Sequence, residues 1–588
     1  METFGATAPE MGSNGVNGPE GLTDWNSVNW RKANRQVRNL RCRIFRASQQ
    51  GDFRKVASLQ KLMLRSYSNR LIAVRRVTQV NQGKRTPGVD KVLVKTPKAR
   101  GNLVDDLATV QPWRAHPTKR VYIPKAGGKT RPLGIPAIKD RAFQAMVKNA
   151  LEPSWEARFE GTSYGFRPGR GCHDAIQKIF NLARPNKRKK WILDADIEGA
   201  FDTIDHEYLM RAIGPVPGRE LIRQWLKAGY VDRGVFHPTE AGTPQGGVIS
   251  PLLANIALHG MEEAIGVRRK NRGEIISPRA VVRYADDFVV FTESQDDADA
   301  VREILRNWLG HRGLTLSTEK TRIVHLTEGF NFLGFNVRHY PAPQTSKSGY
   351  KLLIKPSRES VSQIRSKLRM EWLQLRGHNV RAVLRWLNPI IRGQANYYRI
   401  GVASETFSSL DHWMFQRQVR WVKYTHPQKP KYWTKERYWG RLVNSRQDHW
   451  VFGDKHTGAF LWKFGWFPIE RHILVQGSAS RDDPALKEYW AKRDTAGAKA
   501  LSPKLRKIAR RQGYGCEICG ESLFNEEELH RHHIVPRSRG GKDTSDNLVL
   551  RHLFCHGQIH ATRSDVRELL EPDAVKVARP VLRGGGPG

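Results

Sequence analysis

"AVVRYADDFVVFT", residues 280–292, sets two adjacent aspartates between two apolar runs. The runs predict two strands, which places their connection near Ala285 to Asp287. The neighbouring carboxylates of Asp286 and Asp287 repel each other unless they are protonated or held against a cation. The pair therefore marks either a solvated turn, in which aspartate is common, or a metal site.

"WILDADIEGAFDTIDH", residues 191–206, predicts a second buried strand that carries Asp194 and Asp196. Because these residues are two positions apart in a strand, their side chains share one face. Nucleotide addition by phosphoryl transfer needs carboxylates that hold two Mg²⁺ ions about 4 Å apart. An aspartate on a strand that faces an aspartate on a hairpin can provide such a site.

The chain is strongly basic, because 99 lysines and arginines against 57 aspartates and glutamates give a net charge of +42 over 588 residues. Solubility does not require this bias, whereas a nucleic acid would neutralise it and release counterions. A single basic run is typical of a solvated helix face, but such runs recur along the chain, often beside aromatic residues that can stack on bases. A chain of this length is expected to form several domains.

The cysteine count and the length of the apolar runs indicate in which cellular compartment the protein is expected. Five cysteines do not make a disulfide framework in a chain of 588 residues, which favours a reducing compartment. No apolar run approaches the length of a membrane span, and residues 1–24 lack the basic start and apolar core of a signal peptide. We expect a cytoplasmic protein with no membrane partner.

Further stretches match one known family in chain order. They are "VYIPKAGGKTRPLGIPAIKDR" (121–141), "SYGFRPGRGCHDAI" (163–176), "AGTPQGGVISPLLANI" (241–256), "GLTLSTEKTRI" (313–323) and "FNFLGFNV" (330–337). Together with the aspartate stretch, they resemble group II intron reverse transcriptases. The resemblance implies a right-hand polymerase with fingers and palm that acts as an RNA-directed DNA polymerase.

The resemblance assigns roles to residues around the aspartates. Asp196, Asp286 and Asp287 would be the catalytic triad that binds Mg²⁺, and the spacing to Phe201, the family's aromatic gate against ribonucleotides, favours Asp196 over Asp194. The residues implied at the incoming nucleotide or the primer-template are Lys125, Lys129, Arg131, Phe201, Gln245 and Gly246. The local sequence of the last two is equally compatible with a tight turn before a helix.

"LNPIIRGQANYY", residues 387–398, lies in a segment of helical periodicity and resembles the thumb or maturase domain, which in the family grips the intron RNA. Arg392, Tyr397 and Tyr398 would contact RNA as a cation beside rings that can stack on bases. Ordinary packing of the two tyrosines within the helical domain is the alternative from the local sequence. The family usually has a large aromatic residue where this chain has Gln394.

Cysteines and histidines gather in the C-terminal part, in "CEICG" (516–520) and "LRHLFCHGQIH" (550–560). The CxxC and HxxC turns each bring two ligands to one side of an ion, which is typical of tetrahedral zinc. The predicted ligands of a structural Zn²⁺ are Cys516, Cys519, His552 and Cys555. An alternative set exchanges His552 for His560.

"HRHHIVPRSRGGKDTSDNLVLRH", residues 530–552, resembles the HNH nuclease motif. The resemblance implies that His533 is the general base, that Asn547 braces a ββα-metal fold, and that His532, His556 and His560 hold one divalent ion. The i, i+4 spacing of the last two residues suits a shared metal on one helix face. A zinc module that binds DNA without cutting it is the alternative.

These patterns predict a multidomain α+β protein with a small zinc-bound ββα-metal domain. The expected parts are a disordered tail (1–24), reverse transcriptase fingers and palm with an N-terminal extension (25–340), a helical thumb or maturase domain (341–425), a DNA-binding region (426–510), an HNH endonuclease domain (511–570) and a flexible tail (571–588). We expect removal of residues 511–588 to spare polymerisation, because the palm is separate.

The function that follows is that of a multifunctional group II intron-encoded protein, which copies RNA into DNA, assists intron splicing and cuts target DNA to prime reverse transcription. Its partners would be its own intron RNA, double-stranded target DNA and deoxynucleoside triphosphates, in a bacterial cytoplasm and at the nucleoid. Both a monomer and a homodimer are compatible with the sequence. The alternatives are a splicing-only maturase and a host-adopted reverse transcriptase.

Overall fold

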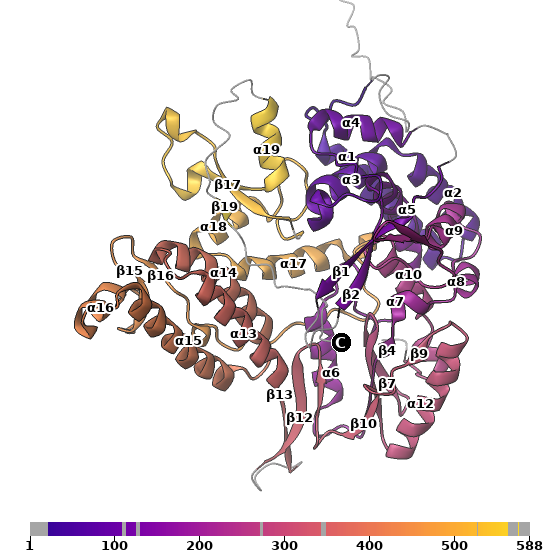
Figure 1. Ribbon diagram of the computed structural model, residues 1–588. Helices are drawn as coiled ribbons and strands as arrows, with labels where there is room; N and C mark the ends of the chain where they lie inside the picture. The colour runs from indigo at the N-terminus through magenta and orange to yellow at the C-terminus, as the bar shows by residue number, and fades with distance from the viewer. Residues whose placement is uncertain are drawn as a thin grey trace, which may run out of the picture.

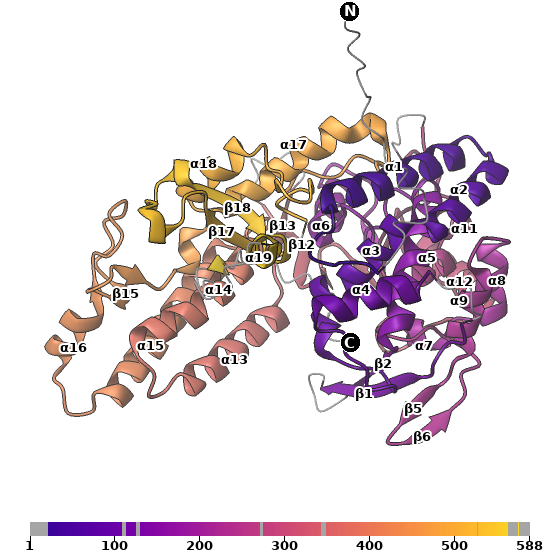
Figure 2. The ribbon, with the colours of Figure 1, turned by 90° about the horizontal axis from the view of Figure 1, so that it is seen from above.

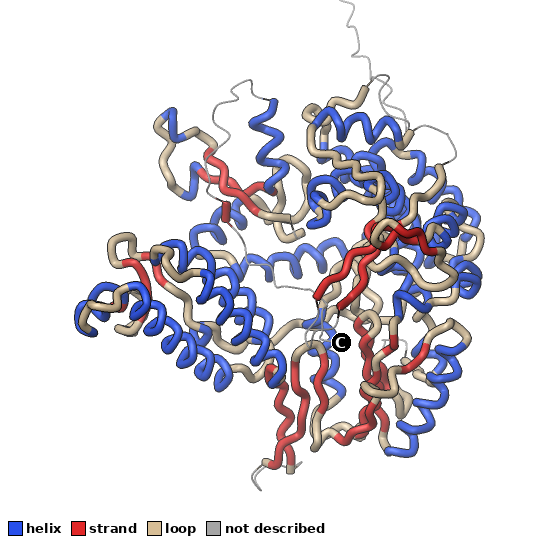
Figure 3. The backbone as a smooth tube through the Cα atoms, in the orientation of Figure 1, coloured by secondary structure: helices blue, strands red, loops and turns tan. Residues whose placement is uncertain are grey.

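The computed structural model describes residues 22–108, 113–124, 130–270, 275–342, 349–525, 527–562 and 574–575. The strands lie in several separate groups, in the middle and at the lower edge of the view and, as smaller groups, at its left and upper left, with helices beside them (Figure 3). Within the described ranges, no helix is both long enough and apolar enough to cross a membrane.

The central sheet carries both aspartate stretches and has the strand order β10-β3-β8-β7. Its strands are β3 (Trp191–Ala195), β7 (Ala280–Tyr284), β8 (Asp287–Thr292) and β10 (Arg322–His325), all antiparallel to their neighbours. Tyr284 pairs with Asp287, so β7 and β8 form the predicted hairpin with Ala285 and Asp286 as its two-residue turn. Ala285 takes the left-handed backbone conformation that such turns require, with a φ of +59°.

Both faces of this sheet are buried, which explains the unbroken apolar runs in its strands. Val289 and Phe291 of β8 point into one hydrophobic cluster, and Phe288 and Val290 point into another on the opposite face. Helix α6 (Cys172–Leu182) belongs to the first cluster and α12 (Gln295–Gly310) to the second. These two helices lie on either side of the sheet in Figure 1.

The β7–β8 turn is held by segments from outside the sheet. Arg283 is 2% exposed, and its Nη1 donates to Oδ1 of Asn255 at 3.0 Å and to the carbonyl oxygen of Ala285 at 3.2 Å. Asn255 in turn donates through Nδ2 to the carbonyl oxygen of Gly165 at 2.9 Å. A Cβ atom on Gly165 would lie 2.3 Å from the backbone nitrogen of Ala285, so only glycine permits this close approach.

A helical layer precedes the sheet. Its members are α1 (Trp30–Gln49), α2 (Phe53–Arg65), α3 (Tyr67–Arg75), α4 (Pro97–Asp106) and α5 (Ile138–Glu156). The side chains of Asn29 and Asp52 cap the first two by accepting bonds from backbone N–H groups. Val37, Leu40 and Ile44 follow helical spacing along α1 and are buried on its inner face.

A second four-stranded sheet, of order β2-β1-β5-β6, adjoins the central one, together with short helices and a two-stranded ladder. The elements are β1 (Thr118–Pro124), β2 (Thr130–Ile135), β4 (Ile197–Glu198), α7 (Ala200–Thr203), α8 (His206–Ile213), α9 (Arg219–Lys227), β5 (Tyr230–Asp232), β6 (Val235–His237), α10 (Ser250–Ala257), α11 (Met261–Ala264) and β9 (Thr315–Leu316). The helix predicted after "TPQGG" is α10.

A three-stranded sheet leads into the predicted helical module. The elements are β11 (Phe330–Phe332), β12 (Phe335–Pro341), β13 (Tyr350–Pro356), α13 (Arg358–Gln374), α14 (Val380–Tyr398) and α15 (Ser404–Thr425). Seen from above, these helices lie apart from α1 and α2, and α17 (Lys487–Gly497) lies between the two groups (Figure 2).

The rest of the chain has more regular structure than its sequence indicates. It contains α16 (Lys431–Tyr438), β14 (Trp439–Gly440), β15 (Val451–Asp454), β16 (Ala459–Phe460), α18 (Pro503–Arg511), β17 (Leu529–His533), β18 (Leu548–His552), α19 (Leu553–Thr562) and β19 (Ala574–Val575). The last strand pairs with β17, although we expected a loose tail there. Thr23, also placed in a disordered tail, is buried and donates through its hydroxyl to Asp105 at 2.6 Å.

The C-terminal unit packs against the polymerase part of the chain, and the effect of its removal on polymerisation stays a prediction. Leu523, Leu529 and Leu548 of that unit share one hydrophobic cluster with Trp25 and Trp30 at the start of the N-terminal helical layer. Removal of residues 511–588 would therefore expose apolar surface on the helices that precede the central sheet.

Gly165→Ala is expected to destabilise the protein by about 1–3 kcal/mol, because the added methyl group overlaps the backbone of the β7–β8 turn. Chemical denaturation followed by fluorescence measures the change.

Gly171→Ala is the matched control, since a Cβ atom there meets no other atom within 4 Å. Equal effects of the two substitutions would contradict the role given to the close approach at Gly165.

Candidate active sites

Asp196, Asp286 and Asp287 meet at one end of the central sheet. Asp196 directly follows β3, Asp286 lies in the β7–β8 turn, and Asp287 opens β8. Ala195 pairs with Phe288 in this antiparallel ladder, so Asp196, which follows Ala195, and Asp287, which precedes Phe288, lie at the same level. The structure thus gathers the three carboxylates that the sequence predicts to act together.

Burial and like charges together raise the pKa values of the carboxylates in this cluster. Burial, and then the carboxylates of Asp286, Asp196 and Asp194, raise the pKa of Asp287 to about 7. Burial, and then Asp196, also raise the pKa of Asp286. A cation held between the carboxylates would relieve both effects, and oxygen donors of this kind are those that Mg²⁺ prefers.

Asp194 and Asp196 differ in their cationic neighbours. Asp194 faces Arg322 with a 3.4 Å ion pair, and burial raises its pKa to about 6. Asp196 accepts a bond from Nζ of Lys320 at 2.8 Å. Sequence reasoning did not single out Lys320, although it lies in the matched stretch "GLTLSTEKTRI". Its ammonium group offsets part of the negative charge of the cluster.

The predicted nucleotide-contacting residues lie beside the carboxylates as far as the structure describes them. Nε of Arg131 donates to Oε1 of Gln245 at 2.7 Å, and Nε2 of Gln245 donates to Oδ2 of Asp202 at 2.9 Å. Phe201 is 7% exposed and packs edge-on against Phe166. Lys125 and Lys129 lie outside the described residues.

A groove of about 450 Å³ opens next to this group. Its walls come from β1, β2, β5 and the segment before α10, and they include Arg120, Tyr122, Phe201 and Gln245. Gly246 fits closely against the same wall, because a Cβ atom there would lie 2.5 Å from the carbonyl oxygen of Gly134. The lining of the groove thus combines a basic side chain and aromatic rings with Gln245.

The residues predicted to contact RNA in α14 lie mainly in packing contacts. Tyr398 is 6% exposed and packs against Phe335, while the Tyr397 hydroxyl donates to the carbonyl oxygen of Leu333 at 2.9 Å. Arg392 lies over the ring of Trp462 at 5.6 Å. Helix packing, the alternative considered for the two tyrosines, describes the buried ring of Tyr398, whereas Tyr397 is only partly buried. Contact with RNA stays a prediction for all three residues.

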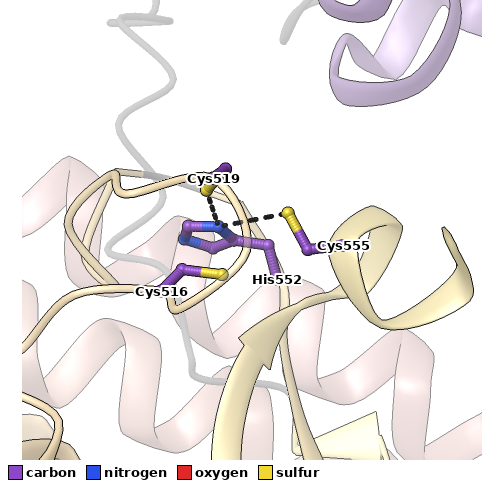
Figure 4. A group of neighbouring side chains, drawn as sticks. All are labelled: Cys516, Cys519, His552 and Cys555. Atoms are coloured by element: carbon purple, nitrogen blue, oxygen red, sulfur yellow. Dashed lines mark hydrogen bonds between the residues drawn. The ribbon is translucent and has the colours of Figure 1, made fainter. Parts of the chain in front are cut away.

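Cys516, Cys519, His552 and Cys555 converge on one point, as Figure 4 shows. All four are at most 1% exposed, and Sγ of Cys519 lies 3.3 Å from Nδ1 of His552. Nε2 of His552 donates to the carbonyl oxygen of Ser522 at 3.1 Å. The lone pair of Nδ1 therefore faces the three sulfur atoms. Three thiols and one imidazole nitrogen suit tetrahedral Zn²⁺, so the residues fit the ion predicted for them.

A second cluster consists of His532, His556 and His560, whose ligand atoms all lie within 4.8 Å of one another. The Nε2 atoms of the last two are 3.3 Å apart. Burial, and then the neighbouring His560, lower the pKa of His556 to about 4, so its imidazole is neutral and able to bind a metal. His560 thus belongs to this cluster, and the set that exchanged it for His552 at the cysteines does not form.

His533 follows His532 in β17 and points to the other face of the strand. Its Nε2 lies 2.6 Å from Oδ1 of Asp543, whose Oδ2 is bonded to Arg537. The bond to His533 lowers the pKa of Asp543, which keeps that carboxylate ionised. Nε2 therefore carries a hydrogen, and Nδ1 of His533 is left as the basic atom. Sequence reasoning missed Asp543, although it lies in the matched motif.

Asn547 closes the loop between the two strands. Its Oδ1 accepts from the backbone nitrogen of Val535 at 2.8 Å, and its Nδ2 donates to the carbonyl oxygens of Val535 and Lys542, each at 3.0 Å. These bonds hold both ends of the segment that contains Arg537. The position of this segment relative to Asp543 and His533 therefore depends on Asn547.

Four family models match this chain in succession. They describe the N-terminal domain of reverse transcriptase (residues 25–107), reverse transcriptase or RNA-dependent DNA polymerase (123–337), a group II intron maturase-specific domain (361–439) and HNH endonuclease (516–562). Reverse transcriptase and HNH domains generally use divalent metals. The carboxylate cluster lies within the second of these matches, and the cysteine and histidine clusters lie within the fourth.

Curated relatives agree with these matches. Protein YkfC of Escherichia coli is 38% identical over 44% of this chain and 77% of that protein. The group II intron-encoded protein LtrA of Lactococcus lactis is 29% identical over 52% of this chain and 64% of its own, so less than two thirds of LtrA is spanned. The telomerase of Candida albicans aligns with 53% of this chain and 58% of its own at 15% identity, but its TM-score of 0.32 supports no argument. The chain belongs to the family of group II intron-encoded reverse transcriptases and contains maturase-specific and HNH endonuclease domains.

Proposed function

We propose that this chain is a multifunctional intron-encoded protein that copies its intron RNA into DNA, assists the splicing of that RNA and cuts the target DNA strand that primes the copy. The observation that carries the proposal is the presence of two separate clusters, one of carboxylates and one of histidines, in a chain with a maturase-specific domain. An enzyme that makes its own primer needs both chemistries in one chain.

In the polymerase, Asp196, Asp286 and Asp287 would hold two Mg²⁺ ions. Mg²⁺ bound there would activate the attacking 3′ hydroxyl and steady the leaving pyrophosphate. Arg131 and Gln245 are bonded to each other beside the groove, where they can position the triphosphate and the primer-template. Phe201 would exclude a ribose 2′ hydroxyl by its bulk, and Lys125 and Lys129 would complete the triphosphate contacts.

In the nuclease, His533 would take a proton from water through Nδ1 while Asp543 holds the hydrogen on Nε2. Asn547 would brace the loop, and His532, His556 and His560 would hold one divalent ion. That ion would polarise the scissile phosphate. A structural Zn²⁺ on Cys516, Cys519, His552 and Cys555 would hold the unit together, because so small a unit has little core of its own.

The roles of the remaining domains are proposed from the family resemblance and from the positive net charge of the chain. Fingers and palm (25–340) and a thumb or maturase domain (341–425) form a right-hand polymerase that grips intron RNA. Residues 426–510 bind double-stranded target DNA, and an HNH domain follows (511–570). The bacterial relatives support a bacterial cytoplasm with the protein held at the nucleoid by its target DNA. The working unit is a monomer or a homodimer, which the sedimentation of the RNA complex distinguishes.

Two substitutions test the division of labour. Asp286→Ala is expected to reduce DNA synthesis to background while cleavage of the target strand continues. His533→Ala is expected to abolish that cleavage while extension of a supplied primer on an RNA template continues. Gel assays of both reactions on the purified RNA complex measure the outcome, and each variant serves as the folding control for the other.

A target DNA that already carries the nick sharpens this test. On such DNA the His533→Ala protein regains target-primed synthesis, because the primer is provided, whereas the Asp286→Ala protein does not. Synthesis by Asp286→Ala, or cleavage by His533→Ala, would contradict the assigned roles. A wild-type protein that extends no primer would instead support a splicing-only maturase.

The raised pKa of Asp287 predicts a pH-dependent stability in Mg²⁺-free buffer. The folded state holds the proton up to about pH 7, whereas the unfolded chain releases it near the usual value of 3.8. Stability is therefore lost as the pH rises from 4 to 7. Asp287→Asn is uncharged at every pH, so it is expected to stabilise the protein at pH 7.5 by on the order of 2–4 kcal/mol, with a gain that disappears near pH 4.

Denaturation at the two pH values measures this gain, and Asp296→Asn at an exposed position of α12 controls for the general loss of a negative charge. A gain of equal size at both pH values would show that Asp287 is not held protonated.

Asp543→Ala is expected to slow strand cleavage roughly 10-fold, because His533 loses the group that orients it. Asp543→Glu should restore part of the rate, and reverse transcription should not change. Asp546→Ala is the matched control, because Asp546 is a nearby exposed carboxylate. An unchanged cleavage rate in Asp543→Ala would mean that other atoms orient His533.

A further inference from the structure

The cysteine cluster of the nuclease unit lies against the N-terminal helices of the polymerase part. Cys516, Cys519 and Cys555 belong to the same hydrophobic cluster as Trp30 and Leu71. The two parts of the chain are adjacent in Figure 1, where α19 stands beside α1, α3 and α4. The cluster is therefore buried by an interface and not only by its own unit.

Directed hydrogen bonds fix this interface. Nε2 of Gln558 in α19 donates to the carbonyl oxygens of Asn26 at 2.8 Å and Val28 at 3.0 Å. On the other side of the cluster, Nδ2 of Asn34 in α1 donates to the carbonyl oxygen of Cys519 at 3.0 Å. The turn that carries two of the four clustered residues is thus bonded to a helix almost five hundred residues earlier in the chain.

Arg75, the last residue of α3, makes the most direct contact. Its Nη2 donates to Sγ of Cys555 at 3.1 Å and to Oε2 of Glu527 at 3.1 Å. The guanidinium also lies over the ring of Trp30 at 4.7 Å. Arg75 is 5% exposed. A guanidinium that is stacked, ion-paired and buried in this way has one orientation, so its bond to the sulfur atom is held by the polymerase part of the chain.

The chemistry of the cluster explains why such a donor matters. Three thiolates and a neutral imidazole around Zn²⁺ carry one net negative charge, which is costly to bury. An N–H donor to a ligating thiolate offsets part of that charge and disfavours the protonation that releases the metal. Arginine suits this position, because its guanidinium remains charged when it is buried.

We propose that Arg75 is a positioning residue of the zinc site, so that zinc retention by the nuclease unit depends on its docking against the N-terminal helices of the reverse transcriptase. This inference rests on the zinc assignment proposed above. It makes the metal site a shared property of two domains. A nuclease unit that leaves the helices loses the donor to Cys555 and holds its zinc less tightly.

The test uses the full-length protein loaded with Zn²⁺ and titrated with a chromogenic chelator of known affinity. Arg75→Gln is expected to weaken zinc binding by roughly 10- to 100-fold, the usual effect of removing a hydrogen bond to a metal ligand. Arg70→Gln is the matched control, since Arg70 is 7% exposed in the same helix and donates to the carbonyl oxygen of Arg65. Its zinc affinity should equal that of the wild type.

Cobalt substitution separates a bond to the metal ligand from a general loss of packing. In the Co²⁺-loaded protein, loss of the N–H donor makes the Cys555 sulfur more electron-rich. The sulfur-to-cobalt charge-transfer band of Arg75→Gln is therefore expected at lower energy than that of the wild type. Arg70→Gln should leave the band in place, whatever its effect on stability.

Asn34→Ala keeps the inference testable if Arg75→Gln does not fold. Asn34 is half-buried on α1, and the substitution removes its hydrogen bond to the Cys519 carbonyl oxygen. We expect zinc binding roughly 2- to 10-fold weaker, the effect of one hydrogen bond. A wild-type protein that binds no zinc would overturn the zinc assignment itself. If the wild type binds zinc and the Arg75 and Asn34 variants bind it equally tightly, with an unshifted cobalt band, the proposed role of Arg75 and of docking is overturned and the zinc assignment stands.

Discussion

Repulsion among buried carboxylates is the constraint around which the polymerase part of this chain is arranged. Asp286 and Asp287 lie in and directly after a two-residue turn, beside Asp196, with their pKa values raised by burial and by one another. Repulsion between these carboxylates destabilises the turn that carries them. The turn is held in place because the sheet is buried on both faces and because Arg283 donates a hydrogen bond to the carbonyl oxygen of Ala285.

The same principle, in which distant segments hold a reactive group, governs the nuclease unit. Alternation along β17 places His532 with His556 and His560 and turns His533 to the opposite face, where it is bonded to Asp543. One strand therefore separates the proposed metal ligand from the proposed general base. Asn547 keeps the loop beside them closed.

The polymerase and nuclease parts are packed into one body. Arg41 of α1 bonds Glu152 of α5 and Asp482 of the segment before α17, and all three side chains are largely buried. Arg170 near α6 donates to the carbonyl oxygen of Gly477 at 2.7 Å. These contacts hold the segment between the helical module and the nuclease unit against the polymerase part. The nuclease unit in turn packs against the first helices, so the two ends of the described chain lie together.

Local patterns in the sequence were sufficient for the hairpin, the helix after "TPQGG" and the cluster of three cysteines with His552, because each depends on periodicity or on residue spacing within a short stretch. The cluster of His532, His556 and His560 was expected from the resemblance to the HNH motif. The surroundings of residues whose neighbours are distant in the sequence were visible only in the tertiary structure. Asp194 is set apart from Asp196 by Arg322, Tyr398 is withdrawn into the core by Phe335, and Cys555 is bonded by Arg75. The reason is physical: a pattern reports what a residue can do, whereas burial and pairing depend on which remote segments the folded chain brings to it.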